Sequence, residues 1–238
     1  IYVNEGGFLG DVSLFDGQYF NLSPKELRVM DPQQRMLLEV VHGVFERYGC
    51  SLDSLKNSLT GVFVGISTND YATLSQSSLL EDSLGIHSTT GNMFSTTVGR
   101  ISYQFGLTGP NMAIDTACSS SLVAVQLACQ SIQAGECDQA LAGGVNLILN
   151  PQSYISLCND GVISKAARCK TFDAEADGFV YSEGCGVVLI KSLDKAITDG
   201  DEILAIIRGG AINQDGISTG LTVPNGDQQR QLLSAALN

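Results

Sequence analysis

The stretch that most constrains the fold of this chain runs from Asp115 to Ile132 and reads DTACSSSLVAVQLACQSI. After a small, polar opening it is apolar nearly all the way round, which predicts a helix that is buried. Cys118 stands at the start of that helix, where unpaired backbone N–H groups and the helix dipole favour negative charge. Such a position shifts a thiol toward the reactive thiolate, so Cys118 is a candidate nucleophile. The spacing alone leaves a small buried hydrophobe as the other interpretation of this cysteine. Its small neighbours leave room for a substrate to approach: Ala117, Ser119, Ser120 and Ser121.

Composition narrows the class of protein. The 238 residues, of which 44% are hydrophobic and 16% charged, suffice for one large globular domain or two small ones. A net charge of −12 argues against nucleic-acid binding through phosphate neutralisation. No apolar run reaches the length of a membrane span and no signal peptide opens the chain. We therefore expect a cytoplasmic protein, with an organelle as the alternative.

The cysteines do not predict a metal centre. Seven are present, and none falls into a CxxC or a His/Cys ligand spacing. An odd number of cysteines that form no disulfide framework is typical of a protein in a reducing compartment. We interpret the six besides Cys118 as small buried hydrophobes: Cys50, Cys129, Cys137, Cys158, Cys169 and Cys185.

Helix and strand signals alternate along the chain, as is typical of α/β proteins. Proline follows Ser23 and Asp31, which predicts two helix starts, and Gly49 should end the second helix. Residues 69–87 are polar and predict a loop-rich segment, and a last helix is expected over 228–237. Apolar runs predict buried strands at 60–66, 112–114, 140–149, 185–193 and 203–208. The strand at 112–114 should deliver Cys118 to the helix that follows.

The motif Asp115-Thr116-Ala117-Cys118-Ser119-Ser120-Ser121 resembles the nucleophile motif of β-ketoacyl synthases, in particular the ketosynthase domains of type I polyketide synthases. Other stretches resemble the same family in the same order: GGFLGDVSLFD at 6–16, SPKELRVMDPQQRMLLEV at 23–40, the RCK and ADG motifs within 168–178, NQDG at 213–216 and LT-PNG at 221–226. The resemblance covers essentially the whole chain. It implies an α/β, thiolase-like fold of α-β-α-β-α layers, present here as the first half and the start of the second. Residues 1–190 would form the N-terminal half and 191–238 the beginning of the C-terminal half, so we expect a fragment cut at both ends.

The chain departs from the family pattern at a few positions. Val41-His42-Gly43 stands where the family commonly has a Trp, and Val98 replaces a small Ala. Ser164-Lys165-Ala166-Ala167 replaces the usual SPDG before RCK. Tyr181 and Ser182 replace an Arg and a Gly beside the expected site.

The resemblance also implies a reaction. Cys118 would take an acyl chain from a thioester, and a malonyl-type thioester on an acyl carrier protein would lose carbon dioxide and attack the acyl-cysteine. The phosphopantetheine belongs to that carrier protein, so no cofactor is expected in this domain, and the full-length domain would be a homodimer. The family also uses two histidines, in an HGTGT and a later GH motif, and a lysine. Neither motif is present, and we interpret His42 and His87 as solvated, so we expect these residues alone to be inactive in condensation.

Three other functions remain open from the sequence. The parent domain could be a non-elongating relative that only transfers or holds acyl chains, since such relatives keep the cysteine. It could be a thiolase or another acyltransferase of the same fold, which the DTACSSS, NQDG and LT-PNG set disfavours. It could also be a non-catalytic dimerisation module.

Overall fold

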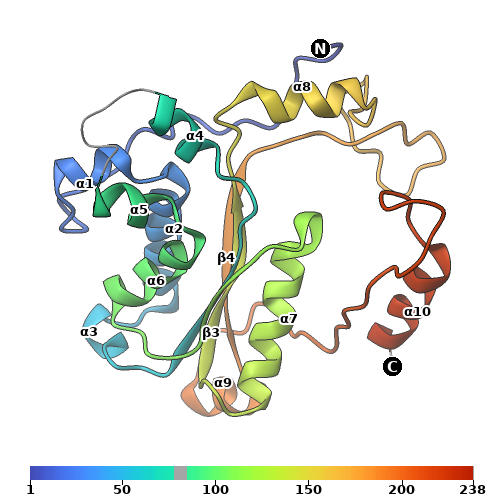
Figure 1. Cartoon of the computed structure of the whole chain (residues 1–238). Coiled ribbons are helices and arrows are strands. Elements are labelled where there is room, and N and C mark those ends of the chain that lie inside the picture. Colours follow the sequence, from blue (N-terminus) through green and yellow to red (C-terminus); the bar gives the residue numbers. More distant parts are fainter. Residues whose placement is uncertain (78–84, 238) are drawn as a thin grey trace.

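The protein is built on one four-stranded mixed sheet (Figure 1). The computed structural model describes residues 1–77 and 85–237. In the sheet the strands lie in the order β2-β1-β3-β4. Strand β1 pairs in parallel with β2 and β3, whereas β4 runs antiparallel to β3. The strands are β1 (Thr60–Gly65), β2 (Asn111–Ile114), β3 (Gln139–Asn146) and β4 (Gly184–Lys191).

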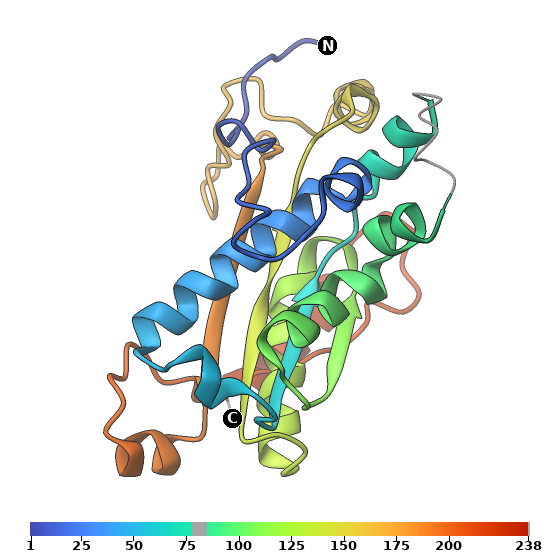
Figure 2. The same ribbon diagram turned by 90° about the vertical axis from the view of Figure 1, so that its left-hand side faces the viewer.

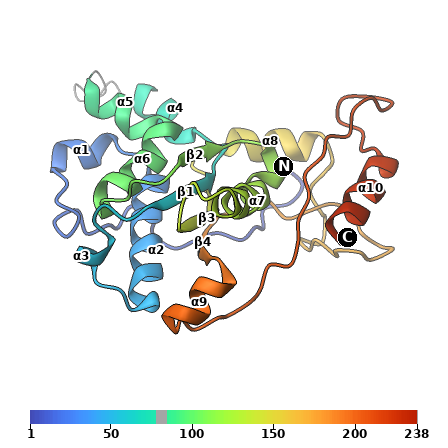
Figure 3. The same cartoon turned by 90° about the horizontal axis from the view of Figure 1, so that it is seen from below.

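Helices cover both faces of this sheet. Alternate residues of β1 point to opposite sides, so Val62 and Val64 join a core with helices α2 (Pro32–Tyr48) and α6 (Phe94–Phe105). Phe63, between them, joins the second core with Ala124 and Ala128 of α7 (Ser120–Gln133). Figure 3 looks along the sheet and shows α2 and α6 on one side of the strands and α7 on the other. The result is a helix–sheet–helix sandwich with its cores on either side of β1.

The remaining helices lie around this sandwich. Figure 2 shows the face on which α1, α2, α5 and α6 gather. Helix α8 lies at one end of the sheet and α9 at the other, while α10 stands away from it (Figure 1). Their bounds are α1 (Pro24–Val29), α3 (Leu52–Leu55), α4 (Asp70–Ser77), α5 (Ile86–Asn92), α8 (Pro151–Asn159), α9 (Leu193–Asp199) and α10 (Gly226–Leu237).

The predicted helix signals are confirmed. Ser23 caps α1 by accepting from the backbone N–H of Glu26, and Asp31 caps α2 by accepting from the N–H of Gln33. Proline occupies the first turn in both helices, where its missing N–H costs nothing. Gly49 ends α2 in the left-handed conformation with a φ of 76°.

Two predicted segments were wrong. Residues 203–208 form no strand, because no described strand lies beside them to share backbone hydrogen bonds, and Leu204 is 90% exposed. The polar segment 69–87 is not simply a loop, since α4 occupies Asp70–Ser77 and His87 lies in α5. Part of that prediction, residues 78–84, falls outside the described residues.

Strands β1 to β4 otherwise fall where the apolar runs predict them. Strand β3 ends at Asn146, whereas the sequence predicted a strand to residue 149. The backbone N–H groups after Asn146 donate to side chains instead of to a neighbouring strand. The N–H of Ile148 donates to Glu183, and the N–H groups of Leu149 and Asn150 donate to Asp70. Within the described residues, no helix has the length and apolarity that crossing a bilayer requires.

Candidate active site at the start of helix α7

Cys118 lies in the connection between β2 and α7. Strand β2 ends at Ile114, a 3₁₀ turn spans Ala117–Ser119, and α7 begins at Ser120. The strand-to-helix delivery of Cys118 predicted from the sequence is therefore confirmed. The Cys118 side chain is exposed, so a substrate can reach the sulfur from solvent.

The turn that presents Cys118 contains a strained residue. Ala117 has a φ of 54°, in the left-handed region that a side chain disfavours at a cost of about 1–3 kcal/mol. Its N–H donates to Asp115 Oδ1 at 3.0 Å, which holds the residue in this conformation. Strain of this kind persists only where surrounding bonds enforce it, and here it lies directly before the nucleophile candidate.

Ser120 closes the turn from the helix side. Its Oγ accepts from the N–H of Thr116 at 2.9 Å and donates to the carbonyl of Ala117 at 2.7 Å. Ser120 is buried although it is polar, because both bonds satisfy its hydroxyl. This one side chain thereby ties both ends of the Cys118 turn together.

The first turn of α7 carries no side-chain cap. Ser119 occupies the N-cap position, but its Oγ donates to the carbonyl of Thr116 at 2.9 Å and lies 2.9 Å from Thr116 Oγ1. The positive end of the helix dipole is therefore not offset by a capping oxygen beside Cys118. The thiolate preference inferred from the sequence is compatible with this arrangement and stays a prediction.

Two glycines let the start of α7 lie directly on the sheet. A Cβ on Gly65 would lie 2.7 Å from the Ser120 carbonyl carbon and 2.7 Å from the Ser121 nitrogen. A Cβ on Gly144 would lie 3.0 Å from the Ser121 Cβ. Sequence analysis did not identify these positioning residues. The available signal was a glycine inside each predicted strand, which marks close backbone approach.

Helix α7 is less buried than its sequence predicts. Ser120, Ala124, Ala128 and Ser131 form the buried face against the sheet, whereas Leu122 is 74% exposed. The expectation of burial on all sides was wrong, because the described residues leave the outward face of the helix only partly covered.

Two of the other six cysteines are fully buried as predicted. Cys137 and Cys158 are buried, and Cys50, Cys129 and Cys185 are partly buried. Burial raises the pKa of the Cys185 thiol to about 12 and also raises the pKa of Cys129. Cys169 is exposed, which corrects the expectation for that residue. It lies in the loop after α8, where its Sγ accepts from the N–H of Val180 at 3.4 Å.

The surroundings of the two histidines differ from the solvated positions that the sequence predicted. His42 is not simply solvated as predicted, because its Nε2 lies 2.5 Å from Tyr19 Oη and its side chain is only 18% exposed. His87 lies in α5 and is partly buried. In the described part of the chain, neither histidine forms a hydrogen bond with Cys118.

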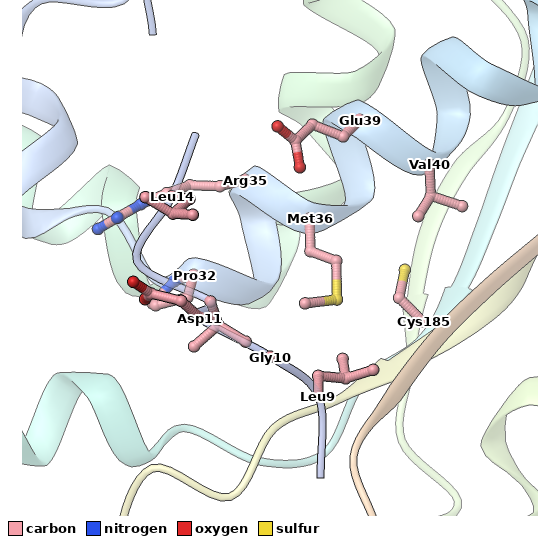
Figure 4. Close-up of a pocket in the computed structure, with 11 residues that line it drawn as sticks. Leu9, Gly10, Asp11, Leu14, Pro32, Arg35, Met36, Glu39, Val40 and Cys185 are labelled. Carbon is pink, nitrogen blue, oxygen red and sulfur yellow. The ribbon is translucent and has the colours of Figure 1, made fainter. Parts of the chain in front are cut away.

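Two cavities lie away from Cys118. One of about 330 Å³ lies between the N-terminal loop and α2 and includes Leu9, Arg35, Met36 and Cys185 in its lining (Figure 4). The other, of about 730 Å³, lies at the start of α10 and includes Asn225 and Arg230. Neither lining includes Cys118.

The fold and the exposed cysteine at a strand-to-helix junction are those of a thiolase-like α/β domain. Residues 1–196 match the family model described as "Beta-ketoacyl synthase, N-terminal domain". The chain belongs to the β-ketoacyl synthase family.

Curated relatives are type I polyketide synthases. The chain is 50% identical over 232 residues to a phenolphthiocerol/phthiocerol polyketide synthase protein of Mycobacterium tuberculosis, covering 98% of this chain and 15% of that protein. It is 48% identical over 239 residues to polyketide synthase GfsA of Streptomyces halstedii, covering 99% of this chain and 3% of that protein. The chain thus spans a small part of the length of these relatives.

Solved ketosynthase domains share the fold. The ketosynthase from module 6 of the bacillaene synthase of Bacillus subtilis 168, as a mutant, superimposes with a TM-score of 0.88 at 39% identity. That match covers 98% of this chain and 38% of the solved chain. An oxazolomycin ketosynthase domain of Streptomyces albus JA3453 gives a TM-score of 0.89 at 39% identity, with 98% and 41% covered. The thiolase-like fold class is confirmed, and the chain spans about two fifths of these domains.

Proposed function

We propose that this chain carries the nucleophile of a polyketide-synthase ketosynthase and that Cys118 is that nucleophile. The observation that carries the proposal is the exposed Cys118 in a strained turn, immediately before the uncapped start of α7. This geometry gives a thioester access to Cys118 and places the residue before the positive end of a helix dipole. The family supports the same assignment, because its motif places the nucleophile at this cysteine.

In the first stage Cys118 would form a covalent acyl-enzyme. Its sulfur attacks the carbonyl carbon of an acyl thioester, the new acyl–sulfur bond forms, and the donor thiol leaves. The backbone N–H of Cys118 serves as one donor to the oxyanion of the tetrahedral intermediate. The donor would be the phosphopantetheine thioester of an acyl carrier protein, which brings the cofactor with it.

In the second stage a malonyl-type thioester on the carrier protein would lose carbon dioxide. The resulting carbanion attacks the acyl-cysteine carbonyl, a carbon–carbon bond forms, and the Cys118 thiolate is released. Charge on the enolate and the oxyanion requires further donors, which the family supplies from histidines outside the motifs present here. We therefore propose that these 238 residues accept acyl groups but do not complete the condensation.

We also propose a homodimer through the free edge of β2. This strand is the last in the sheet order, so its outer backbone groups face no partner strand among the described residues. Met112 in β2 is 45% exposed, and the flanking helices expose Tyr103 of α6 and Leu122 of α7 at 87% and 74%. An exposed edge with apolar side chains beside it suits pairing with a second copy.

Two further expectations belong to this proposal. Residues 1–190 would form the N-terminal half of the ketosynthase domain and residues 191–238 the beginning of its C-terminal half. The protein would be located in the reducing cytoplasm.

Acyl loading tests the assignment of Cys118. The chain is incubated with a short acyl thioester, and the acylated peptide is identified by mass spectrometry. Cys169 is a matched control because it is the other exposed cysteine of the described residues. We expect acylation at Cys118 that is lost in Cys118→Ala and kept in Cys169→Ser. Equal acylation of both cysteines would contradict the proposed nucleophile.

A further inference from the structure

We propose that Tyr19 is an activated phenol and therefore a covalent modification site for small electrophilic acyl donors. His42 would act as its general base, and Glu46 would orient the histidine. The site lies on α2, which covers the face of the sheet opposite to α7 and its Cys118 turn. The inference therefore does not rest on the function proposed for Cys118.

The three side chains form a nucleophile–base–orienter series. Tyr19 Oη lies 2.5 Å from His42 Nε2, within reach for proton transfer. On the other side of the ring, His42 Nδ1 lies 3.5 Å from Glu46 Oε2. The carboxylate favours the tautomer with the proton on Nδ1, so the lone pair of Nε2 is left to accept from the phenol.

The fold holds the imidazole in place for this role. His42 and Glu46 lie one turn apart in α2, and the His42 ring packs edge-on against Tyr19 with centroids 5.0 Å apart. Phe20, which is 4% exposed, also packs edge-on against the His42 ring, with centroids 6.3 Å apart. A base whose orientation is fixed by packing loses little entropy when it acts.

The nucleophile of the series is accessible. Tyr19 is 54% exposed, whereas the His42 side chain is 18% exposed. The N–H of Tyr19 donates to Asp16 Oδ1 at 2.9 Å, which fixes the backbone from which the phenol projects. Tyr19 is therefore open to a small reagent, while the His42 ring is sheltered.

This arrangement depends on a residue at which the chain departs from its family. His42 lies in the region where the family commonly has a Trp. A Trp ring nitrogen only donates hydrogen bonds, so it could not accept a proton from Tyr19. The base is thus a feature of this chain's own sequence.

The chemical step is a simple acyl transfer. Tyr19 Oη attacks the acyl carbon, an oxygen–acyl bond forms, and the bond between the acyl group and its leaving group breaks. His42 Nε2 takes the phenolic proton and passes it to the leaving group. With N-acetylimidazole as the donor, the products are O-acetyl-tyrosine and imidazole.

Labelling with N-acetylimidazole tests the proposal. The rate at each tyrosine is followed by peptide mapping, and release by hydroxylamine identifies the phenyl ester. Tyr103 is the matched control, since it is 87% exposed in the single chain and forms no side-chain hydrogen bond among the described residues. The labelling is done on the monomeric fraction from gel filtration, because Tyr103 borders the edge proposed for the homodimer. We expect Tyr19 to react about tenfold faster than Tyr103 or more, as general-base assistance provides. Equal rates at the two tyrosines would overturn the proposal.

Two variants separate the base from mere accessibility. His42→Phe keeps a ring against Tyr19 and Phe20 but removes the acceptor, so the Tyr19 rate should fall to that of Tyr103. An unchanged rate in this variant would overturn the proposal. If circular dichroism shows that His42→Phe does not fold, Glu46→Gln decides, because Glu46 is 68% exposed and its replacement disturbs no packing. A slower Tyr19 in Glu46→Gln supports the proposal, and an unchanged rate contradicts it.

Discussion

Gly65 and Ser120 lie in backbone contact, and a Cβ on Gly65 would lie 2.7 Å from the carbonyl carbon of Ser120. Gly65 ends β1, and Ser120 begins α7 while its hydroxyl closes the Cys118 turn. The position of the candidate nucleophile relative to the sheet thus depends on residue 65 being a glycine, which has no Cβ.

Gly65→Ala should displace the start of α7. The added methyl group meets backbone atoms that cannot move aside alone, so we expect a loss of about 1–3 kcal/mol in the free energy of unfolding. Acyl loading of Cys118 should fall as well. Gly43→Ala is the control, because its Cβ would meet no atom within 4 Å, and alanine stabilises a helix interior by about 0.5–1 kcal/mol. Urea unfolding of both variants measures the difference, and equal stabilities would refute the contact argument.

Cys118 should react with iodoacetamide faster than the other six cysteines. The proposed reason is its position before the positive end of α7, and its exposed position admits the reagent. Cys169 is the informative comparison because it is exposed without a helix start. Peptide mapping after brief alkylation measures the order, and a faster Cys169 would count against the helix effect.

Arg100→Met should destabilise the fold through Glu26. Arg100 Nη1 lies 2.6 Å from Glu26 Oε1, with side chains 10% and 19% exposed, and Arg100 Nε donates to Gln34 at 2.9 Å. Removing one partner of a largely buried pair typically costs about 3–5 kcal/mol. Arg230→Met is the control, since the Arg230–Asp227 pair is 80% and 73% exposed and should contribute little. Comparable urea midpoints for the two variants would disprove the role assigned to Arg100.

The raised pKa of Cys185 predicts a loss of stability in alkali. Burial raises the pKa of this thiol from 9.0 to about 12, so the unfolded chain ionises first. The stabilising contribution of the buried, neutral Cys185 thiol is fully present below pH 9.0. It is lost as the pH rises from 9.0 toward 12. The difference in unfolding free energy between the natural chain and Cys185→Ala should therefore shrink across that range. A pH-independent difference would show that the thiol titrates normally.

Decarboxylative condensation should fail with these 238 residues alone. Cys118 is the proposed nucleophile, but the histidine motifs that stabilise the enolate in the family are not in this sequence. A radiolabelled malonyl thioester is offered to the acyl-loaded chain, with a complete ketosynthase as the positive control. Formation of a chain-extended product would show that the residues present suffice.

Local patterns in the sequence identified much of this protein. Proline and capping residues mark the starts of α1 and α2, and apolar runs mark the four strands, because these signals depend only on neighbours in the chain. The Cys118 motif identified the family and the candidate site for the same reason. The apolar run at 203–208 wrongly predicted a strand. A strand requires a neighbouring strand to share its backbone hydrogen bonds, and a local sequence pattern does not show whether one is present.

Distant contacts decided the remainder. The left-handed Ala117, the contact of Gly65 with Ser120 and the exposed outer face of α7 all depend on how the helix lies against the sheet. Tyr19 and His42 are 23 positions apart and meet only because the loop before α1 folds onto α2. Sequence alone therefore determined which residue is the candidate nucleophile, whereas tertiary packing decided its exposure, its strained turn and its neighbours, because those properties arise between segments that are far apart in the chain.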